Sequence, residues 1–514
     1  MEIKKENINL TERNVKLNSN VMVEGDIIVP DIKPDIREIL LADANVVTQS
    51  SEYRGGKLYV SGNVFFKILY RPDSEGEGCE LKSLDASFEF SDSVDIPSGE
   101  DLTFFVCAST EHIGFTLVNS RKLSMKVIAA LGINGYRERS FAPVTSVTGD
   151  DVQCREKRFN IYMPVADEQS DITVSDFLTV PADMPDIDEI LKVDAWASGG
   201  DCKIMNGKVM VKGTLHLKTL YTAAQDGYTT ELVCHEIPFT EIVEAEGVDE
   251  NCAAGVIFSV KDVLASAKGD INGDTKIISA EILVNARVKA SKTVQETICD
   301  DCYAIHGAME TETEKMELLE YVTSENTEFT ETQSVEMPKN VKMKNVINVT
   351  AKPILRETCV EDGALHMRGT LVSFLLYRED KEDGQIKCAV TETDFDWQKN
   401  VPGQGLFADC DLWVEDIAAT KLSADEAEVK ATMGLNAKVL KKSEIDIITG
   451  CTAVETDEAE ENRPSLVIYF TEDGDTLWDV AKKYGTTVEK IQSANGIETD
   501  RFSSGKKILI PRAC

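Results

Sequence analysis

The chain has 514 residues, 42% of them hydrophobic and 28% charged, which predicts several folded domains because single cores rarely grow beyond about 250 residues. Its formal net charge of -36 excludes nucleic acid and anionic membrane surfaces as expected partners, since both attract Lys and Arg. No apolar run suits a signal peptide or a bilayer span, so we expect a soluble intracellular protein without direct membrane insertion.

A short phrase occurs twice, as VPDIKPDIREIL at residues 29–40 and as VPADMPDIDEIL at residues 180–191. Pro34 and Pro185 suit a first helical position, the acidic residues that follow suit a helix start, and the apolar residues have helical spacing. The phrase therefore predicts a short amphipathic helix. Its carboxylates could instead serve acid–base catalysis, but that requires a carboxylate whose pKa is shifted by burial, and these are predicted on a polar face.

The phrase begins a longer repeat. Gly62 corresponds to Gly213 and then to Gly369, and the dipeptide Leu69-Tyr70 returns as Leu220-Tyr221 and as Leu376-Tyr377. We expect three tandem repeats over residues 1–160, 161–315 and 316–454. The third copy keeps Met337-Pro338 but reads MKNVINV at residues 343–349, without the acidic residues, so we expect its surface role to have diverged.

Each repeat places a turn signal before a run with period-two alternation, which is typical of a β-hairpin. The turns are Gly55-Gly56, Asn206-Gly207 and Asp362-Gly363. In the first two repeats the residues expected on one buried face are Leu58, Val60, Val64, Phe66, Ile68 and Tyr70, and Val209, Val211, Leu215, Leu217 and Tyr221. The glycine inside each run predicts a bulge or bend.

Further strand-like runs follow in each repeat, at residues 102–107, 122–130, 255–260, 276–286 and 428–439. The expected fold class is therefore mainly β, with three antiparallel β-sandwich-like repeats.

Thirteen cysteines in a chain without a secretory signal are expected to be reduced thiols. Cys299 and Cys302 form a CDDC motif, followed by His306, which has the spacing of half a zinc site. No second pair lies at a matching distance. We favour an acidic linker here over a metal site, without excluding the metal.

Residues 455–465, ETDEAEENRPS, have the composition of an acidic linker. From Leu466 onward seven Lys and Arg balance seven Asp and Glu, so residues 466–514 form a neutral module on an acidic body. The pattern predicts a strand, a helix closed by Gly485, a second helix with a capping box of Thr486 and Glu489 that ends at Asn495-Gly496, and a final strand at residues 507–511.

This module resembles a LysM domain, whose pattern matches Tyr469, Gly474-Asp475-Thr476-Leu477, Ala481, Gly485, Ile491, Asn495, Gly505 and residues 508–511. The resemblance implies a βααβ fold and a shallow groove for N-acetylglucosamine chains of peptidoglycan or chitin. Its lining would be Gly474, Asp475, Thr476 and Leu477 facing Asn495, Gly496 and Ile497. The same residues would be needed as turn, cap and core if no sugar bound.

Trp478 lies off the expected core face of the first helix, so it is a candidate contact for a partner. Packing of this ring against a neighbouring loop is an equal alternative.

Tandem β-repeats with the PDIxEIL phrase and a strand ending in Leu-Tyr, followed by one LysM module, resemble the SPOCS-domain spore-coat proteins of clostridia, in particular the SipL type. The resemblance implies a mother-cell protein that helps to encase the forespore by binding the coat's basement-layer ATPase, sporulation stage IV protein A. We expect a scaffold without a catalytic site or cofactor. Because no export signal would bring the neutral module to the cell wall, we also expect its LysM groove to recognise protein.

Two other function classes compete with this interpretation. A cell-wall hydrolase targeted by LysM should carry a catalytic motif, and the sequence has no HExxH, GxSxG or P-loop. A peptidoglycan-binding wall protein should carry an export signal, which we do not find.

Overall fold

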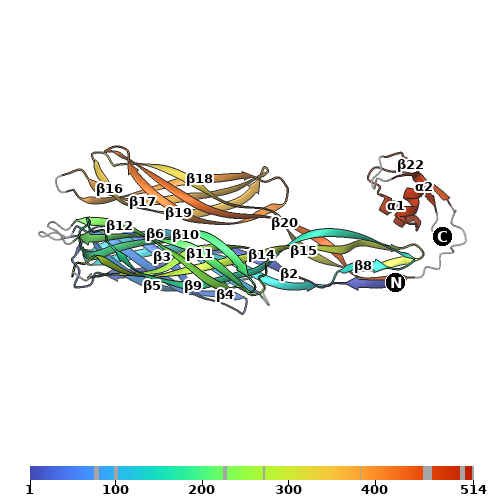
Figure 1. Cartoon of the computed structure of the whole chain (residues 1–514), viewed down its shortest axis with the longest axis horizontal. Helices are drawn as coiled ribbons and strands as arrows, with labels where there is room; N and C mark the ends of the chain where they lie inside the picture. The colour runs from blue at the N-terminus through green and yellow to red at the C-terminus, as the bar shows by residue number, and fades with distance from the viewer. Residues whose placement is uncertain are drawn as a thin grey trace.

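Antiparallel strand pairing accounts for nearly all of the ordered structure (Figure 1). The computed structural model describes residues 1–73, 80–97, 102–223, 229–269, 273–381, 384–454, 466–497 and 504–511. The expected linker at residues 455–465 lies outside these ranges. Neither of the helices in the described part of the chain is long and apolar enough to cross a membrane.

The same set of strands occurs three times along the chain. Repeat 1 contains β2 (Ile8–Ile28), β3 (Ile36–Arg54), β4 (Lys57–Pro72), β5 (Lys82–Asp95), β6 (Thr103–Asn119) and β7 (Lys122–Phe141). Repeat 2 contains β9 (Val152–Thr179), β10 (Ile187–Met205), β11 (Lys208–Ala223), β12 (Thr230–Glu244), β13 (Ala253–Lys268) and β14 (Ile277–Ala304). Repeat 3 contains β15 (Ala308–Glu336), β16 (Met343–Glu361), β17 (Ala364–Glu379), β18 (Ile386–Asn400), β19 (Leu406–Lys421) and β20 (Glu426–Val454).

Each repeat folds into two three-stranded sheets. The orders are β2-β7-β6 with β3-β4-β5, β9-β14-β13 with β10-β11-β12, and β15-β20-β19 with β16-β17-β18. Apolar side chains from both sheets of a repeat form its core. The expected fold class, mainly β with three antiparallel sandwich-like repeats, is confirmed. The expected boundaries near residues 160 and 315 fall inside β9 and β15, so the division into domains stays a proposal.

The central hairpins follow the sequence pattern. Arg54 pairs with Lys57 across Gly55 and Gly56, whose φ angles are 60° and 82°, and such positive φ angles suit glycine. All eleven residues expected on the buried faces of β4 and β11 are buried.

The glycine that recurs within the central strand of each repeat also has a structural reason, as Gly62 shows. Opposite Gly62, the register of β3 shifts between Thr48 and Ser50, so the predicted bulge lies in the neighbouring strand. A Cβ at Gly62 would lie 2.8 Å from the ring of Phe90 and would also clash with the carbonyl of Val47.

The phrase PDIxEIL is not helical, so this prediction was wrong. Residues 31–33 form a turn, and Ile36 begins β3, with its N–H donating to the carbonyl of Ser120 at 2.8 Å. The hydroxyl of Tyr70, from the Leu-Tyr dipeptide, donates to the carbonyl of Pro34 at 3.1 Å. Tyr221 and Pro185 repeat this bond at 3.1 Å. Partners far away in the chain thus override a local helical pattern.

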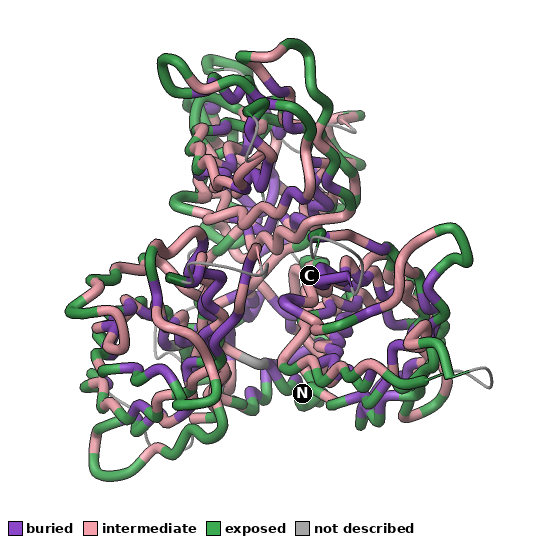
Figure 2. Tube along the Cα trace, turned by 90° about the vertical axis from the view of Figure 1, so that its left-hand side faces the viewer, coloured by how far each residue is buried: buried purple, intermediate pink, exposed green. Residues whose placement is uncertain are grey.

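The three repeats surround a common axis, and Figure 2 shows them as three lobes about a centre. The leucines of the three Leu-Tyr dipeptides meet there, since Leu69, Leu220 and Leu376 belong to one buried cluster. Beside them, the ammonium of buried Lys192 pairs with Asp43 of repeat 1 at 3.2 Å and with Asp194. Lys352 of repeat 3 also pairs with Asp43. Leucines and a charged network therefore join the repeats.

The glutamate of each phrase pairs with a lysine of another repeat, in a cyclic order. Glu38 of repeat 1 binds Lys387 of repeat 3 at 2.9 Å, and Glu189 of repeat 2 binds Lys82 of repeat 1. Both lysines lie directly opposite a tyrosine of a Leu-Tyr dipeptide.

The interface of repeats 2 and 3 has neither the glutamate nor the lysine of this pair. Asn345 occupies the position of Glu38 at the start of β16, and Glu231 lies opposite Tyr221, where the other two repeats have lysine. The loss of the acidic residue in repeat 3 thus matches the loss of the basic residue in repeat 2.

Beyond the sandwiches, the paired strands β2–β7, β9–β14 and β15–β20 continue as a narrower stem (Figure 1). The short strands β1 (Glu2–Lys5) and β8 (Val144–Thr148) pair with each other beside it. Two small apolar clusters fill the stem; one includes Phe141, Ile298 and Met316, and the other contains several cysteines. The stem therefore has a core with contributions from all three repeats.

Candidate docking site

The C-terminal module consists of β21 (Leu466–Phe470), α1 (Leu477–Tyr484), α2 (Val488–Asn495) and β22 (Lys507–Pro511). The predicted βααβ order is confirmed. The hydroxyl of Thr476 caps α1 by accepting from the N–H of Asp479, and Gly485 ends α1 with a φ of 60°. The expected capping box was displaced by one residue, because Thr487 caps α2. Thr486 is buried, and its hydroxyl donates to the carbonyl of Pro511 at 2.7 Å.

The side chains of the first predicted groove turn support the fold. The carboxylate of Asp475 accepts from the N–H of Glu472 at 2.7 Å and from the hydroxyl of Tyr469 at 2.8 Å. These bonds, the backbone bond first, lower the pKa of Asp475. Leu477 is fully buried in the module core, whereas Gly474 is exposed with a φ of 98°.

The second turn is built in the same way. The side-chain amide of Asn495 donates to the carbonyl of Leu509 at 2.6 Å and accepts from its N–H at 2.7 Å. Ile497 packs against the module core, and Gly496 is exposed with a φ of 63°. What the two turns offer a ligand is therefore mainly exposed backbone at Gly474 and Gly496. Sugar binding in this groove stays a prediction.

Trp478 lies against the end of the stem. Its ring packs edge-on against Tyr303 with 4.9 Å between centroids, and its indole N–H donates to Asp301 at 2.7 Å. The guanidinium of Arg155 lies over the indole at 5.3 Å. Trp478 is 7% exposed as a result.

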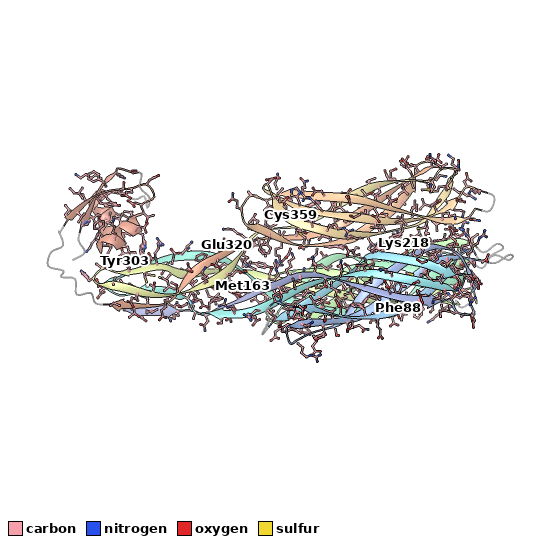
Figure 3. The ribbon with its side chains drawn as sticks, turned by 180° about the vertical axis from the view of Figure 1, so that it is seen from behind. Phe88, Met163, Lys218, Tyr303, Glu320 and Cys359 are labelled. Carbon is pink, nitrogen blue, oxygen red and sulfur yellow. The ribbon has the colours of Figure 1, made fainter. Side chains whose placement is uncertain are left out.

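Tyr303 of the stem lies beside the module (Figure 3) and belongs to the same apolar cluster. The hydroxyl of Tyr303 donates to the carbonyl of Thr486 at 2.7 Å, and the ammonium of Lys482 lies 2.7 Å from the carboxylate of Asp301. Burial opposes ionisation of Asp301, but the bonds from Lys482 and Trp478 outweigh it and lower the pKa. Tyr303 and Ile305 belong to the apolar core of the module. The module therefore docks on the stem through a buried and charge-paired contact.

The CDDC motif forms part of this contact, so the expected acidic linker was wrong. Residues 299–302 lie within β14, and Cys299 and Cys302 are buried. His306 does not join them, because its ring pairs with Asp151. No group of three or more His, Cys, Asp or Glu side chains in the described ranges is arranged to hold a metal ion.

Sequence patterns alone did not point to the residues of the stem that receive Trp478. The signal available was the apolar pair Tyr303 and Ile305 directly after CDDC, which is unusual for a solvated linker. Their pairing with the module joins residues 183 positions apart, and no local pattern encodes such a contact.

Comparisons with known families agree with this architecture. A model described as the SipL, SPOCS domain matches residues 35–118 and 186–268, which lie in repeats 1 and 2. A LysM domain model matches residues 472–511. No curated protein and no solved structure gives a significant match. The chain is therefore a SipL/SPOCS-domain protein with a C-terminal LysM domain.

Proposed function

We propose that this protein is a non-enzymatic scaffold of the spore coat that binds a coat morphogenetic ATPase, sporulation stage IV protein A, at the forespore surface in the mother cell. The name of the SPOCS family supports a role in coat morphogenesis. The observation that carries the proposal is the docked Trp478. A LysM surface that already binds Tyr303, Asp301 and Arg155 is chemically suited to protein side chains.

A second surface of the module also favours protein recognition. On β21, every second residue faces solvent, and Leu466, Ile468 and Phe470 are 52%, 51% and 63% exposed. Three apolar side chains in a row on one strand are rare on a surface without a partner. We assign this strip to the ATPase, because it stays accessible when Trp478 is docked.

Peptidoglycan binding is the second candidate function. The LysM match and the exposed backbone at Gly474 and Gly496 support it, since backbone N–H groups can bond to acetamido and hydroxyl groups. A hydrolase anchored by the module has less support, because the described sheets bring together no catalytic set that we recognise.

Pull-downs of the full chain on immobilised ATPase and on peptidoglycan sacculi, with N-acetylglucosamine oligomers as competitor, would separate these functions. We expect retention by the ATPase that the oligomers do not reverse. The double variant Ile468→Ser/Phe470→Ser should lose it, while Leu264→Ser, at a residue 60% exposed on repeat 2, should not. Retention by sacculi alone would contradict the proposal.

A further inference from the structure

Four cysteines from three strands meet in the stem, although they are far apart in the sequence. They are Cys154 of β9, Cys299 and Cys302 of β14, and Cys451 of β20. The sulfur atoms of Cys154 and Cys299 lie 3.0 Å apart. Cys302 contacts both Cys299 and Cys451. Apolar residues such as Val147 and Ile448 enclose the group.

An irregularity in β14 brings the two CDDC thiols together. Residues three apart on a regular strand point to opposite faces of the sheet. Here the register shifts between Cys299 and Asp301, and Cys302 lies directly opposite Cys154. Both thiols therefore point inward, while Asp300 turns outward and pairs with Arg155 at 2.6 Å.

We propose that Cys154 and Cys299 form a redox-sensitive pair, which a two-electron oxidant such as hydrogen peroxide converts into a disulfide. Their separation favours this over metal binding. Two thiolates on a tetrahedral zinc ion, at about 2.3 Å each, lie roughly 3.8 Å apart. Sulfur atoms at 3.0 Å are closer than that and need only a small approach to bond.

The two thiols are suited to different steps. Cys154 is partly exposed, whereas Cys299 is buried. The hydrogen bond with Cys299, opposed by burial, lowers the pKa of Cys154 to about 7. Cys154 is thus the thiol that can meet the oxidant and is about half ionised at pH 7, and Cys299 is placed to react with the product.

The chemistry balances in two steps. The thiolate of Cys154 attacks one peroxide oxygen, so an S–O bond forms, the O–O bond breaks, and the leaving hydroxide takes up a proton as water. The sulfur of Cys299, after losing its proton, attacks the resulting sulfenic acid; the S–S bond forms and a second water leaves. Two thiols lose two electrons, and one peroxide gains them.

The pair is adjacent to the docking site. Asp301 and Tyr303, which hold the LysM module, follow Cys299 on the same strand, and Arg155 follows Cys154. A disulfide would fix the bulge that orients these residues. Oxidation and docking of the module are therefore expected to be coupled.

The test uses the reduced full-length protein, treated with a small excess of hydrogen peroxide at pH 7, alkylated, and mapped by mass spectrometry without reduction. We expect the first disulfide to join Cys154 and Cys299. Cys154 has a larger thiolate fraction at pH 7 than a thiol of ordinary pKa, and this outweighs the lower nucleophilicity that accompanies its lower pKa. Cys154 should therefore be oxidised about fivefold faster than Cys359, which lies outside the group of four cysteines.

Variants separate the two roles. Cys299→Ser should leave a sulfenic acid at Cys154 that dimedone traps, Cys154→Ser should abolish both products, and Cys359→Ser should change neither. Near-ultraviolet circular dichroism would show that the variants remain folded. Oxidation spread evenly over the thiols, or zinc that copurifies and protects all four cysteines, would overturn the proposal.

Discussion

Replacement of Lys192 with leucine removes the cation at the centre of the three repeats. Repeat 1 has Leu41 at the corresponding position, so the new side chain fits the surroundings of this site. The change leaves Asp43 and Asp194 facing each other with one fewer cation. Loss of one partner from a buried ion pair costs about 3–5 kcal/mol, and we expect the lower end because Asp43 keeps Lys352.

The pH dependence of the free energy of unfolding shows whether the lost charge pair causes the destabilisation. Burial works against ionisation of Asp43, but Lys352 and Lys192 outweigh it and hold its pKa far below the usual range. A carboxylate whose pKa is depressed on folding stabilises the protein above its unfolded pKa near 4, and the contribution is lost as the pH falls through the folded value. Without Lys192 the folded pKa rises, so protonation near pH 4 should relieve part of the penalty in the variant.

The assay is urea unfolding followed by circular dichroism at pH 7 and pH 4. The matched control is Lys208→Leu, which breaks an exposed pair with Glu244 at 2.5 Å and should cost at most about 1 kcal/mol. If Lys192→Leu is no more destabilising than this control, or if its effect is the same at both pH values, the role of Lys192 is refuted.

Three further predictions concern the interfaces and the strands. Lys387→Glu should destabilise the contact of repeats 1 and 3 by about 0.5–1 kcal/mol, and it should cost less in a Glu38→Gln background, where no like charge faces the new carboxylate, as a double-mutant cycle in urea would show. Trp478→Ala should release the module, so that hydrogen exchange of α1 and of Tyr303 accelerates, while Phe470→Ala should leave both protected. Gly62→Ala should cost about 1–3 kcal/mol in thermal unfolding, because the new Cβ would clash with the ring of Phe90 and with the carbonyl of Val47. Gly132→Ala on β7, whose new Cβ would meet nothing closer than 3.9 Å, should be tolerated.

Patterns of short range predicted much of the fold. The alternation in β4 and β11 identified buried residues correctly because a strand's side chains alternate between faces whatever lies beyond it. The turn at Gly55-Gly56 was predictable because positive φ angles restrict the residue type. Helix caps and glycine ends predicted the two helices of the C-terminal module for the same reason, although Thr487 and not the expected Thr486 caps the second helix.

Features that depend on distant partners were not predictable in this way. The phrase at residues 29–40 has helical spacing, but its backbone bonds to Ser120 and its Glu38 pairs with Lys387 of repeat 3. Trp478 could be singled out as unusual, yet its partner Tyr303 lies on another module. The four thiols come together only because three strands that are remote in sequence converge in the stem.

Zero-length cross-linking with a carbodiimide, followed by mass spectrometry, tests the assembled architecture most directly, because it joins only carboxylates and amines already in contact. We expect cross-links between Glu38 and Lys387, Glu189 and Lys82, and Asp301 and Lys482. The pair of Lys208 and Glu244 within one sheet is the positive control. Cross-links confined to pairs within single repeats would contradict an arrangement in which three repeats share one axis and the LysM domain docks on their stem.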